Sequence, residues 1–214
     1  MAFNDAPEFA SLSDDIVAVG GDLRVETLLR AYWNGIFPWP EDEDSPVLWF
    51  HPDPRGILRT DHLHISRSLQ RVLKRQPFRI CVNRDFTAVI DHCATAPRPQ
   101  QSGTWITPAM RDAYIALHRA GWAHSVEAYE QDHLVGGLYG VFVGGVFSGE
   151  SMFHLVDNAS RVALVALMGM LRQMGISFLD TQMMTPVVES MGGERVSRQE
   201  YLDLLRHSHA RCGQ

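Results

Sequence analysis

The sequence predicts an α+β protein whose sheet is mixed but largely antiparallel. Three strand-like segments, HSVEAYE, HLVGGLYGVFV and VFSGESMF, follow one another between residues 124 and 153. The dipeptide Gly144-Gly145 separates the last two, and it suits a two-residue hairpin turn because both positions tolerate positive φ. Helical patterns precede and follow this group, which is typical of α+β folds.

Composition places the chain among ordinary globular proteins. Its 214 residues are 45% hydrophobic and 21% charged, enough for one large domain or two small ones. No apolar run approaches the roughly 20 residues that span a bilayer, and no basic segment followed by an apolar run opens the chain, so neither secretion nor membrane insertion is expected. The expectation is a cytoplasmic monomer.

Cysteine and histidine spacing predicts neither a disulfide framework nor a metal site. The three cysteines, Cys81, Cys93 and Cys212, lie far apart and form no C-x-x-C motif. The ten histidines lack the H-E-x-x-H spacing of zinc enzymes. We therefore expect no metal and no cofactor. The net charge of −6 argues against a general nucleic-acid binder, although cations are concentrated locally.

Residues 1–54 are predicted to form a small N-terminal α/β domain, rich in turns and aromatic residues. The segment VETLLRAYWNG has apolar residues at helical spacing, and Gly35 is placed to end that helix. Pro52 and Pro54 interrupt any regular element. The second predicted domain therefore covers residues 55–214.

A short amphipathic helix is predicted in HISRSLQRVLKRQPF, with Ser66 as its N-cap and an apolar stripe beginning at Leu69. Its opposite flank carries Arg67, Arg71, Lys74 and Arg75. Such a flank is either a solvated helix face or a surface for a phosphate backbone.

The following segments alternate between strand and helix patterns. FRICVN is predicted to be a strand and FTAVIDHCAT a short helix. The polar segment PRPQQSG is predicted to be a loop. A longer helix then begins at Thr107 as N-cap, with Pro108 in its first turn, and ends at Gly121.

Glu150 is the only ionisable residue in the apolar strand VFSGESMF. An ionised carboxylate that loses water without gaining partners is costly, so it is either held by neighbours or used to bind a cation. If the hairpin loop is only Gly144-Gly145, Val143 faces Val146 and Tyr139 faces Glu150.

The C-terminal third contains a second polar pair on a strand. NASRVALVALMGMLRQMG is predicted to be an apolar helix capped by Asn158 and ended by Gly175. In the strand ISFLDTQ, Asp180 and Gln182 share one face. They could hold a nucleophile or satisfy backbone groups at a strand end. LDLLRH is predicted to be the final helix.

Several motifs in fixed order carry a family resemblance. GGDL, LLRAYWNGIFPW, LWFHPDPR, LHISRSL, GTWIT, LVGGLYG, GESMF, NASR and DTQ closely resemble the bacterial leucyl/phenylalanyl-tRNA-protein transferases, over roughly Val19 to Leu205. The resemblance implies a second domain with the fold of the GCN5-related N-acetyltransferases. It also implies transfer of Leu or Phe, and less well Met, from aminoacyl-tRNA to the N-terminal Lys or Arg of proteins, creating an N-end rule degradation signal.

The resemblance also implies roles for residues at matching positions. The catalytic positions are Asp180, Gln182 and Glu150. The amino-acid pocket would be lined by Tyr32, Trp39, Trp105, Tyr114, Leu138, Phe147, Leu164, Leu167 and Leu171. The tRNA-binding cluster would be Arg67, Arg71, Lys74 and Arg75.

These matches suggest a separate role for each of the three residues when the acceptor amine attacks the aminoacyl ester. We expect Asp180 to position the attacking amine and assist its deprotonation, and Gln182 to align the reacting carbonyl. Glu150 would hold an ammonium, either that of the aminoacyl group or that of the acceptor.

The chain departs from common relatives at several matched positions. It has His51-Pro52 where they have SP, Arg161 where they have Lys, and Thr181 where they have Cys. Leu167 and Leu171 replace Phe of some relatives, which leaves the preference between Leu and Phe open.

Two alternatives remain open. An acyl-CoA-dependent acetyltransferase would need a glycine-rich helix start, which NASRVA lacks. A non-catalytic adaptor could bind basic N-termini through Glu150 and the EDED segment.

Overall fold

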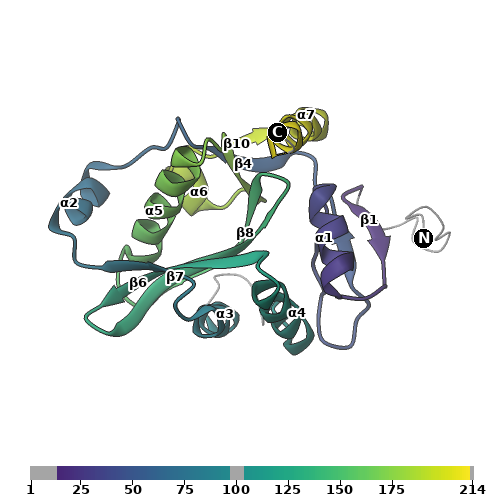
Figure 1. Cartoon of the computed structure of the whole chain (residues 1–214), viewed down its shortest axis with the longest axis horizontal. Coiled ribbons are helices and arrows are strands. Elements are labelled where there is room, and N and C mark those ends of the chain that lie inside the picture. The colour runs from purple at the N-terminus through teal and green to yellow at the C-terminus, as the bar shows by residue number, and fades with distance from the viewer. Residues whose placement is uncertain (1–13, 97–103, 213–214) are drawn as a thin grey trace.

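The computed structural model describes residues 14–96 and 104–212, so the predicted PRPQQSG loop lies entirely outside the described residues. The first part of the chain contributes a three-stranded sheet in the order β1-β3-β2. The strands are β1 (Ile16–Val19), β2 (Phe37–Pro38) and β3 (Leu48–Phe50). Together with helix α1 (Val25–Trp33), this sheet lies at one end of the molecule (Figure 1).

The remaining strands form a seven-stranded sheet in the order β10-β4-β9-β8-β7-β6-β5. Their bounds are β4 (Arg55–Arg59), β5 (Arg79–Val82), β6 (Ala123–Glu130), β7 (His133–Val143), β8 (Val146–His154), β9 (Phe178–Gln182) and β10 (Glu194–Val196). Neighbouring strands are antiparallel except β8 and β9. The predicted mixed, largely antiparallel sheet is therefore confirmed.

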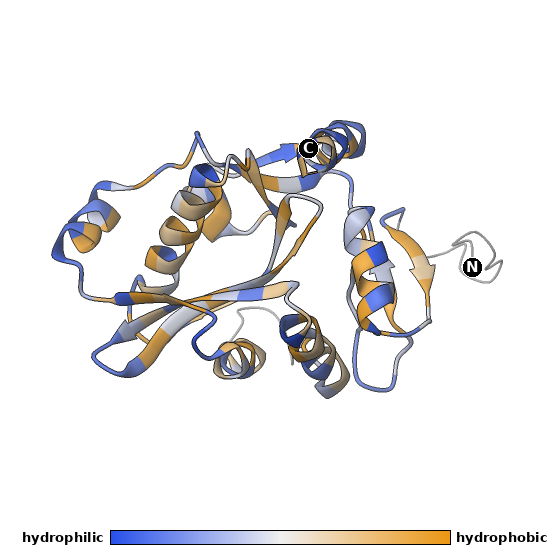
Figure 2. Cartoon of the chain, viewed as in Figure 1, coloured by the Kyte–Doolittle hydropathy of each residue, from blue (hydrophilic) through white to orange (hydrophobic). Residues whose placement is uncertain are grey.

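Helices cover both faces of this sheet (Figure 1). One face packs against α5 (Ala159–Gln173) and α2 (Arg67–Arg75), and the other against α1, α3 (Phe86–Thr95) and α4 (Pro108–Arg119). Because side chains alternate along a strand, Leu138 of β7 joins the core under α5 while Tyr139 joins the opposite core. In Figure 2, α5 is apolar along most of its length, as expected for a covered helix.

The last part of the chain adds the edge strand beside β4 and a helix that packs on β4 and β9. The short helix α6 (Pro186–Ser190) and strand β10 lead into α7 (Arg198–Cys212). Tyr201 and Leu205 of α7 pack on Ile57 of β4 and Phe178 of β9. This helix is longer than the predicted LDLLRH segment, because its outer turns are polar and lack an apolar period.

The structure confirms two of the three predicted N-caps. The side chains of Ser66 and Thr107 accept hydrogen bonds from Leu69 N–H and Met110 N–H, respectively. The prediction for Asn158 is wrong: its side chain makes no capping hydrogen bond, and its backbone is left-handed with φ 67°. Asn tolerates this region, so it supplies the turn before α5.

The β7–β8 hairpin has the predicted turn but not the predicted register throughout. Val143 pairs with Val146, and Gly144 and Gly145 have φ values of 59° and 77°. Farther along, Gly140 pairs with Gly149 but Tyr139 pairs with Ser151, which leaves Glu150 as an extra residue in a β-bulge. The expectation that Tyr139 faces Glu150 is therefore wrong. Counting residue pairs outward from the turn assumes a regular ladder, and the extra residue of the bulge shifts every pair beyond it by one.

The end of α1 lies directly on α7. Gly35 follows the helix with φ 72°, as predicted for a helix stop, and a Cβ there would lie 2.5 Å from the Tyr201 ring. Trp33 also stacks on His209, with ring centroids 3.9 Å apart. These contacts fix the position of α1, whose Tyr32 reaches the seven-stranded sheet.

Candidate active site

Glu150 is the centre of a cluster built from four elements. Its Oε1 accepts hydrogen bonds from Tyr32 Oη of α1 at 2.7 Å and from Gln182 Nε2 of β9 at 2.8 Å. Its Oε2 accepts one from Tyr114 Oη of α4 at 2.9 Å. The bulge in β8 turns this side chain away from the regular pleat and toward the helices. Among the residues that the structure describes, the carboxylate therefore has three hydrogen-bond partners, none of them a cation.

The pattern of hydrogen bonds in this cluster depends on whether Glu150 carries a proton. The two phenol oxygens of Tyr32 and Tyr114 lie 2.5 Å apart, so each touches the other as well as Glu150. Two phenolic protons can serve only two of these three contacts if Glu150 is ionised. When Glu150 is protonated, it donates to one of the two phenols in place of accepting from it, and the three contacts form a closed ring of hydrogen bonds.

The pKa of Glu150 is raised, which is consistent with a carboxyl that can hold a proton in this cluster. Burial raises it from 4.5 to about 7, against the lowering effect of the hydrogen bonds from Tyr32 and Tyr114, while the nearby charge of Asp180 raises it further. Burial and the charge of Glu150 raise the pKa of both phenols well above 10. Glu150 is therefore the group of this cluster that can exchange a proton near neutral pH.

Asp180 occupies a second, fully buried cluster. Its Oδ1 and Oδ2 accept hydrogen bonds from Arg55 Nε at 2.8 Å and Nη2 at 2.7 Å, which is a bidentate ion pair. Oδ2 also accepts from Tyr201 Oη at 2.8 Å and Ser148 Oγ at 3.1 Å. Arg55 also lies over the Tyr201 ring, 4.4 Å from its centroid.

These contacts make Asp180 a poor proton acceptor. Although burial alone would raise it, the charge and hydrogen bonds of Arg55, with those of Gln182 N–H and Tyr201, hold the pKa of Asp180 below 3.8. Two oxygens accepting five hydrogen bonds leave little room for a substrate amine. The expected role of Asp180 in deprotonation is therefore not supported by its surroundings.

Gln182 joins the two clusters. Its backbone N–H donates to Asp180 Oδ1 at 2.9 Å, and its side-chain amide donates to Glu150 Oε1 at 2.8 Å. Its backbone has φ 61°, a left-handed conformation that non-glycine residues rarely adopt, and the β4–β9 register shifts beside it. The three predicted catalytic residues are thus brought together, with Gln182 in the middle.

Aromatic residues continue from the Glu150 cluster. The rings of Trp105 and Tyr114 pack edge-on at 6.3 Å, and Trp39 lies 5.8 Å from Trp105. Both tryptophans are only partly buried. Four of the predicted pocket residues therefore form one aromatic wall beside the carboxylate, namely Tyr32, Trp39, Trp105 and Tyr114.

The other predicted pocket residues lie in a separate core. Leu138, Phe147, Leu164, Leu167 and Leu171 are buried together under α5, on the face of the sheet opposite the α1 and α4 core. They adjoin the Glu150 cluster through β8, on which Phe147 precedes Glu150 by three residues. The sequence therefore predicted one set of lining residues that the structure divides between two cores.

The four cations predicted on α2 are all exposed. Within the described ranges, none of them has a carboxylate at ion-pair distance. Arg79 differs, because it pairs with Asp132 at 3.2 Å. The helix lies at the opposite end of the molecule from α1 (Figure 1).

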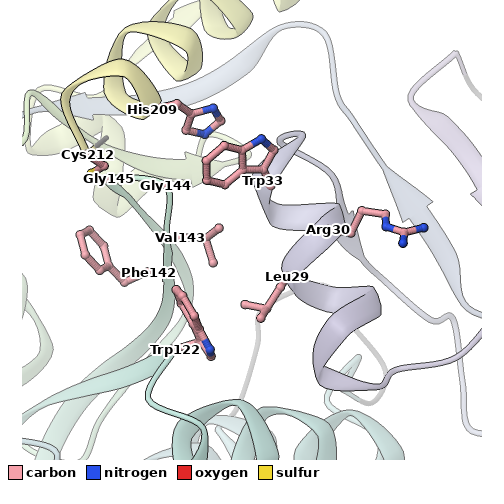
Figure 3. Close-up of a pocket in the computed structure, with 10 residues that line it drawn as sticks. All are labelled: Leu29, Arg30, Trp33, Trp122, Phe142, Val143, Gly144, Gly145, His209 and Cys212. Atoms are coloured by element: carbon pink, nitrogen blue, oxygen red, sulfur yellow. The ribbon is translucent and has the colours of Figure 1, made fainter. Parts of the chain in front are cut away.

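A separate apolar cavity of about 600 Å³ lies between α1, the β7–β8 turn and α7 (Figure 3). Leu29, Trp33, Trp122 and Phe142 supply much of its lining, and Arg30 stands at its edge. Trp33 is about half exposed, at 48%. No residue of the Glu150 or Asp180 clusters lines this cavity.

Sequence reasoning missed three residues of the Asp180 cluster: Arg55, Ser148 and Tyr201. Arg55 ends the motif LWFHPDPR, which carries the family resemblance but assigns Arg55 no role, and Tyr201 precedes the predicted final helix LDLLRH. The sequence gives little indication of these three residues. Arg55 and Ser148 contact Asp180 because β4 and β8 flank β9 in the sheet, and Tyr201 contacts it because α7 packs on these strands.

The described residues contain neither a group of metal ligands nor a membrane-spanning helix. No three His, Cys, Asp or Glu side chains group as metal ligands would. No helix among residues 14–96 and 104–212 has the length and apolar character needed to cross a membrane.

Comparison with protein families gives two adjoining matches. Residues 57–206 match the family described as leucyl/phenylalanyl-tRNA protein transferase. Residues 21–53 match the N-terminal domain of the same family.

Individual proteins give the same result. The chain is 50% identical over 203 residues to the leucyl/phenylalanyl-tRNA–protein transferase of Shewanella baltica (strain OS185), covering 94% of this chain and 84% of that protein. It is 47% identical over 203 residues to that of Shewanella piezotolerans, covering 94% and 85%. A solved structure, L-PGS from Bacillus licheniformis, aligns with TM-score 0.42 and 13% identity over 68% of this chain and 45% of that chain.

Proposed function

Because the chain belongs to the leucyl/phenylalanyl-tRNA–protein transferase family and is thus an aminoacyltransferase, we propose that Leu or Phe, and less well Met, is transferred to an N-terminal Lys or Arg. The donor is an aminoacyl-tRNA and the acceptor a protein. The product carries a new N-terminal residue that marks it for N-end rule degradation. The observation that supports this most directly is the Glu150 carboxylate, which lies beside an aromatic wall and has no cationic hydrogen-bond partner among the described residues.

Glu150 is assigned the role of proton acceptor in this proposal. The acceptor α-amine attacks the ester carbonyl, a C–N bond forms, and the C–O bond to the tRNA ribose breaks. The amine must lose a proton and the ribose oxygen must gain one. With a pKa of about 7, Glu150 is substantially ionised at neutral pH and can take up the first proton.

Gln182 and the aromatic wall are assigned positioning roles. The Gln182 amide, already aimed at Glu150, can align the reacting carbonyl or amine. The aminoacyl side chain binds against Trp39 and Trp105, with the leucine-rich core under α5 forming the deeper wall. Asp180 is assigned to holding Gln182 rather than to proton transfer.

Mass spectrometry of a Lys- or Arg-initiated peptide incubated with Leu-tRNA tests the proposed acceptor specificity. We expect the mass of one added leucine residue. The same peptide with an acetylated N-terminus should gain nothing, because no amine is free to attack, and an Ala-initiated peptide should gain little. Peptide binding without any product would instead favour the adaptor alternative.

The exposed flank of α2 is proposed to bind the tRNA phosphates. Replacing both Arg71 and Lys74 by alanine should weaken Leu-tRNA binding at least tenfold at low salt, because two phosphate contacts are lost. The slope of log K against log salt should become shallower by about 1.5 to 2. Arg119→Ala, an exposed change on α4, is the matched control. Unchanged affinity at every salt concentration would show that the α2 flank is only solvated.

A further inference from the structure

We propose that Arg55 and Tyr201 are positioning residues for transfer: they fix the Asp180 carboxylate, which holds Gln182 in the left-handed backbone conformation that directs its amide to Glu150. The proposal rests on the proposed function of Glu150 and Gln182. It adds Arg55 of β4, which lies 125 residues from Asp180, and Tyr201 of α7, which lies 21 residues from Asp180.

The ion pair between Arg55 and Asp180 is built for orientation. The Arg55 side chain is 1% exposed and that of Asp180 0% exposed, so neither can reorient into water. The guanidinium uses Nε and Nη2 in parallel, which fixes the plane of the carboxylate as well as its position. The rings of Phe37 and Tyr201 lie 4.9 Å and 4.4 Å from the guanidinium carbon. Arg55 is thus held by neighbours from the small sheet and from α7.

Tyr201 is the contact through which α7 reaches the site. Its hydroxyl donates to Asp180 Oδ2 at 2.8 Å, and its ring packs against Gly35 at the end of α1. The same α1 carries Tyr32, which donates to Glu150. Tyr201 therefore sets the position of Asp180 directly and contacts the helix that supplies a partner of Glu150.

The link from Asp180 to Gln182 passes through the backbone. Oδ1 is shared between Arg55 Nε and Gln182 N–H, so the orientation of the carboxylate determines where that N–H can point. A left-handed non-glycine residue is strained and persists only when neighbours hold it. Without a fixed acceptor, Gln182 can relax to the extended conformation, which would turn its amide away from Glu150.

Tyr201→Phe tests this chain of contacts, since it removes one hydroxyl and keeps the ring. With Leu-tRNA and an Arg-initiated peptide, we expect kcat to fall about tenfold while KM for Leu-tRNA stays unchanged. In a Gln182→Ala background, the same change should have no further effect on kcat, because the residue through which it acts is gone. Tyr129→Phe, a buried tyrosine on β6 outside both clusters, is the matched control.

Two results would overturn the proposal. One is a normal kcat for a folded Tyr201→Phe variant. The other is a full additional loss of kcat from Tyr201→Phe in the Gln182→Ala background, as a purely structural effect would give. If Tyr201→Phe fails to fold, Ser148→Ala removes a different hydrogen bond to the same Oδ2 and is judged by the same two outcomes.

A substrate-free measurement separates this proposal from the proposed acceptor specificity. In the protein without tRNA or peptide, Tyr201→Phe and Ser148→Ala should accelerate hydrogen exchange of the Gln182 amide by about tenfold, with Tyr129→Phe unchanged. Unchanged exchange in both variants would refute the positioning role even if Arg-initiated peptides proved to be good acceptors. Altered exchange with no product from such peptides would instead fault the acceptor specificity alone.

Discussion

Glu150→Gln is expected to lower the rate of peptide-bond formation at pH 7.5 by about a hundredfold or more, because a general base typically contributes that much. The amide keeps the size of the side chain and can still contact Tyr32 and Tyr114. It cannot accept a proton from the attacking amine. The measurement is single-turnover transfer of leucine from Leu-tRNA to an Arg-initiated peptide.

The pH profile gives this variant a distinctive result. The wild-type rate should rise with pH through two ionisations, that of Glu150 near pH 7 and that of the acceptor α-amine near pH 8. The variant should keep only the second. Glu130→Gln, the same change at an exposed position of β6, should match the wild type at every pH. A variant that retains the limb near pH 7 would show that another group accepts the proton.

Glu150→Gln should lower activity but should make the stability of the protein less sensitive to rising pH. A carboxyl whose pKa is raised on folding stabilises the protein below its unfolded pKa of about 4.5, and that contribution is lost as pH rises through the folded value of about 7. Glu150→Gln has no charge to bury. Its melting temperature should therefore fall less than that of the wild type between pH 5 and 8. A loss of activity accompanied by equal or greater stability cannot be attributed to unfolding.

Asp180→Asn is expected to lower the free energy of unfolding by about 3 to 5 kcal/mol, because it leaves the buried Arg55 charge without its counter-ion. Urea denaturation at pH 7 measures this. The stabilisation by Asp180 is present above pH 3.8 and is lost as pH falls through its lower folded pKa, so the difference between the proteins should shrink in acid. Asp132→Asn breaks an exposed pair with Arg79 and should change stability by less than about 1 kcal/mol.

Transfer by Asp180→Asn distinguishes a positioning role from a proton-accepting one. We expect a reduced rate with the limb near pH 7 retained but shifted to lower pH. The shift has this sign because removing the negative charge of Asp180, with Arg55 left unpaired, favours ionised Glu150. Disappearance of that limb from a folded variant would return the proton-accepting role to Asp180.

A double variant separates stability from positioning at the same site. Arg55→Met combined with Asp180→Leu replaces the buried pair with apolar side chains, and should recover much of the stability lost in Asp180→Asn. It still leaves Gln182 N–H without its acceptor. Transfer should therefore remain impaired, and a wild-type rate would show that the ion pair has no part in arranging the site.

Local sequence patterns determined the elements whose signals are short-range. The helix of residues 25–33, the caps at Ser66 and Thr107, and the Gly144-Gly145 turn all depend on neighbours a few residues away. The exposed cations of α2 followed from helical periodicity alone. The order of the motifs indicates the family, but the motifs do not show which of their residues contact one another in the folded protein.

Tertiary structure alone decided the surroundings of the two carboxylates. Glu150 and Asp180 are both acidic residues on apolar strands, and nothing in their flanking residues separates their pKa values. The bulge gives Glu150 two phenols and an amide, whereas strand order gives Asp180 an arginine 125 residues away. Burial raises a carboxyl pKa and an adjacent buried cation lowers it. Which of the two prevails depends on contacts between distant segments, so only the folded chain distinguishes Glu150, the proton acceptor that we propose, from Asp180, which we propose holds Gln182 in place.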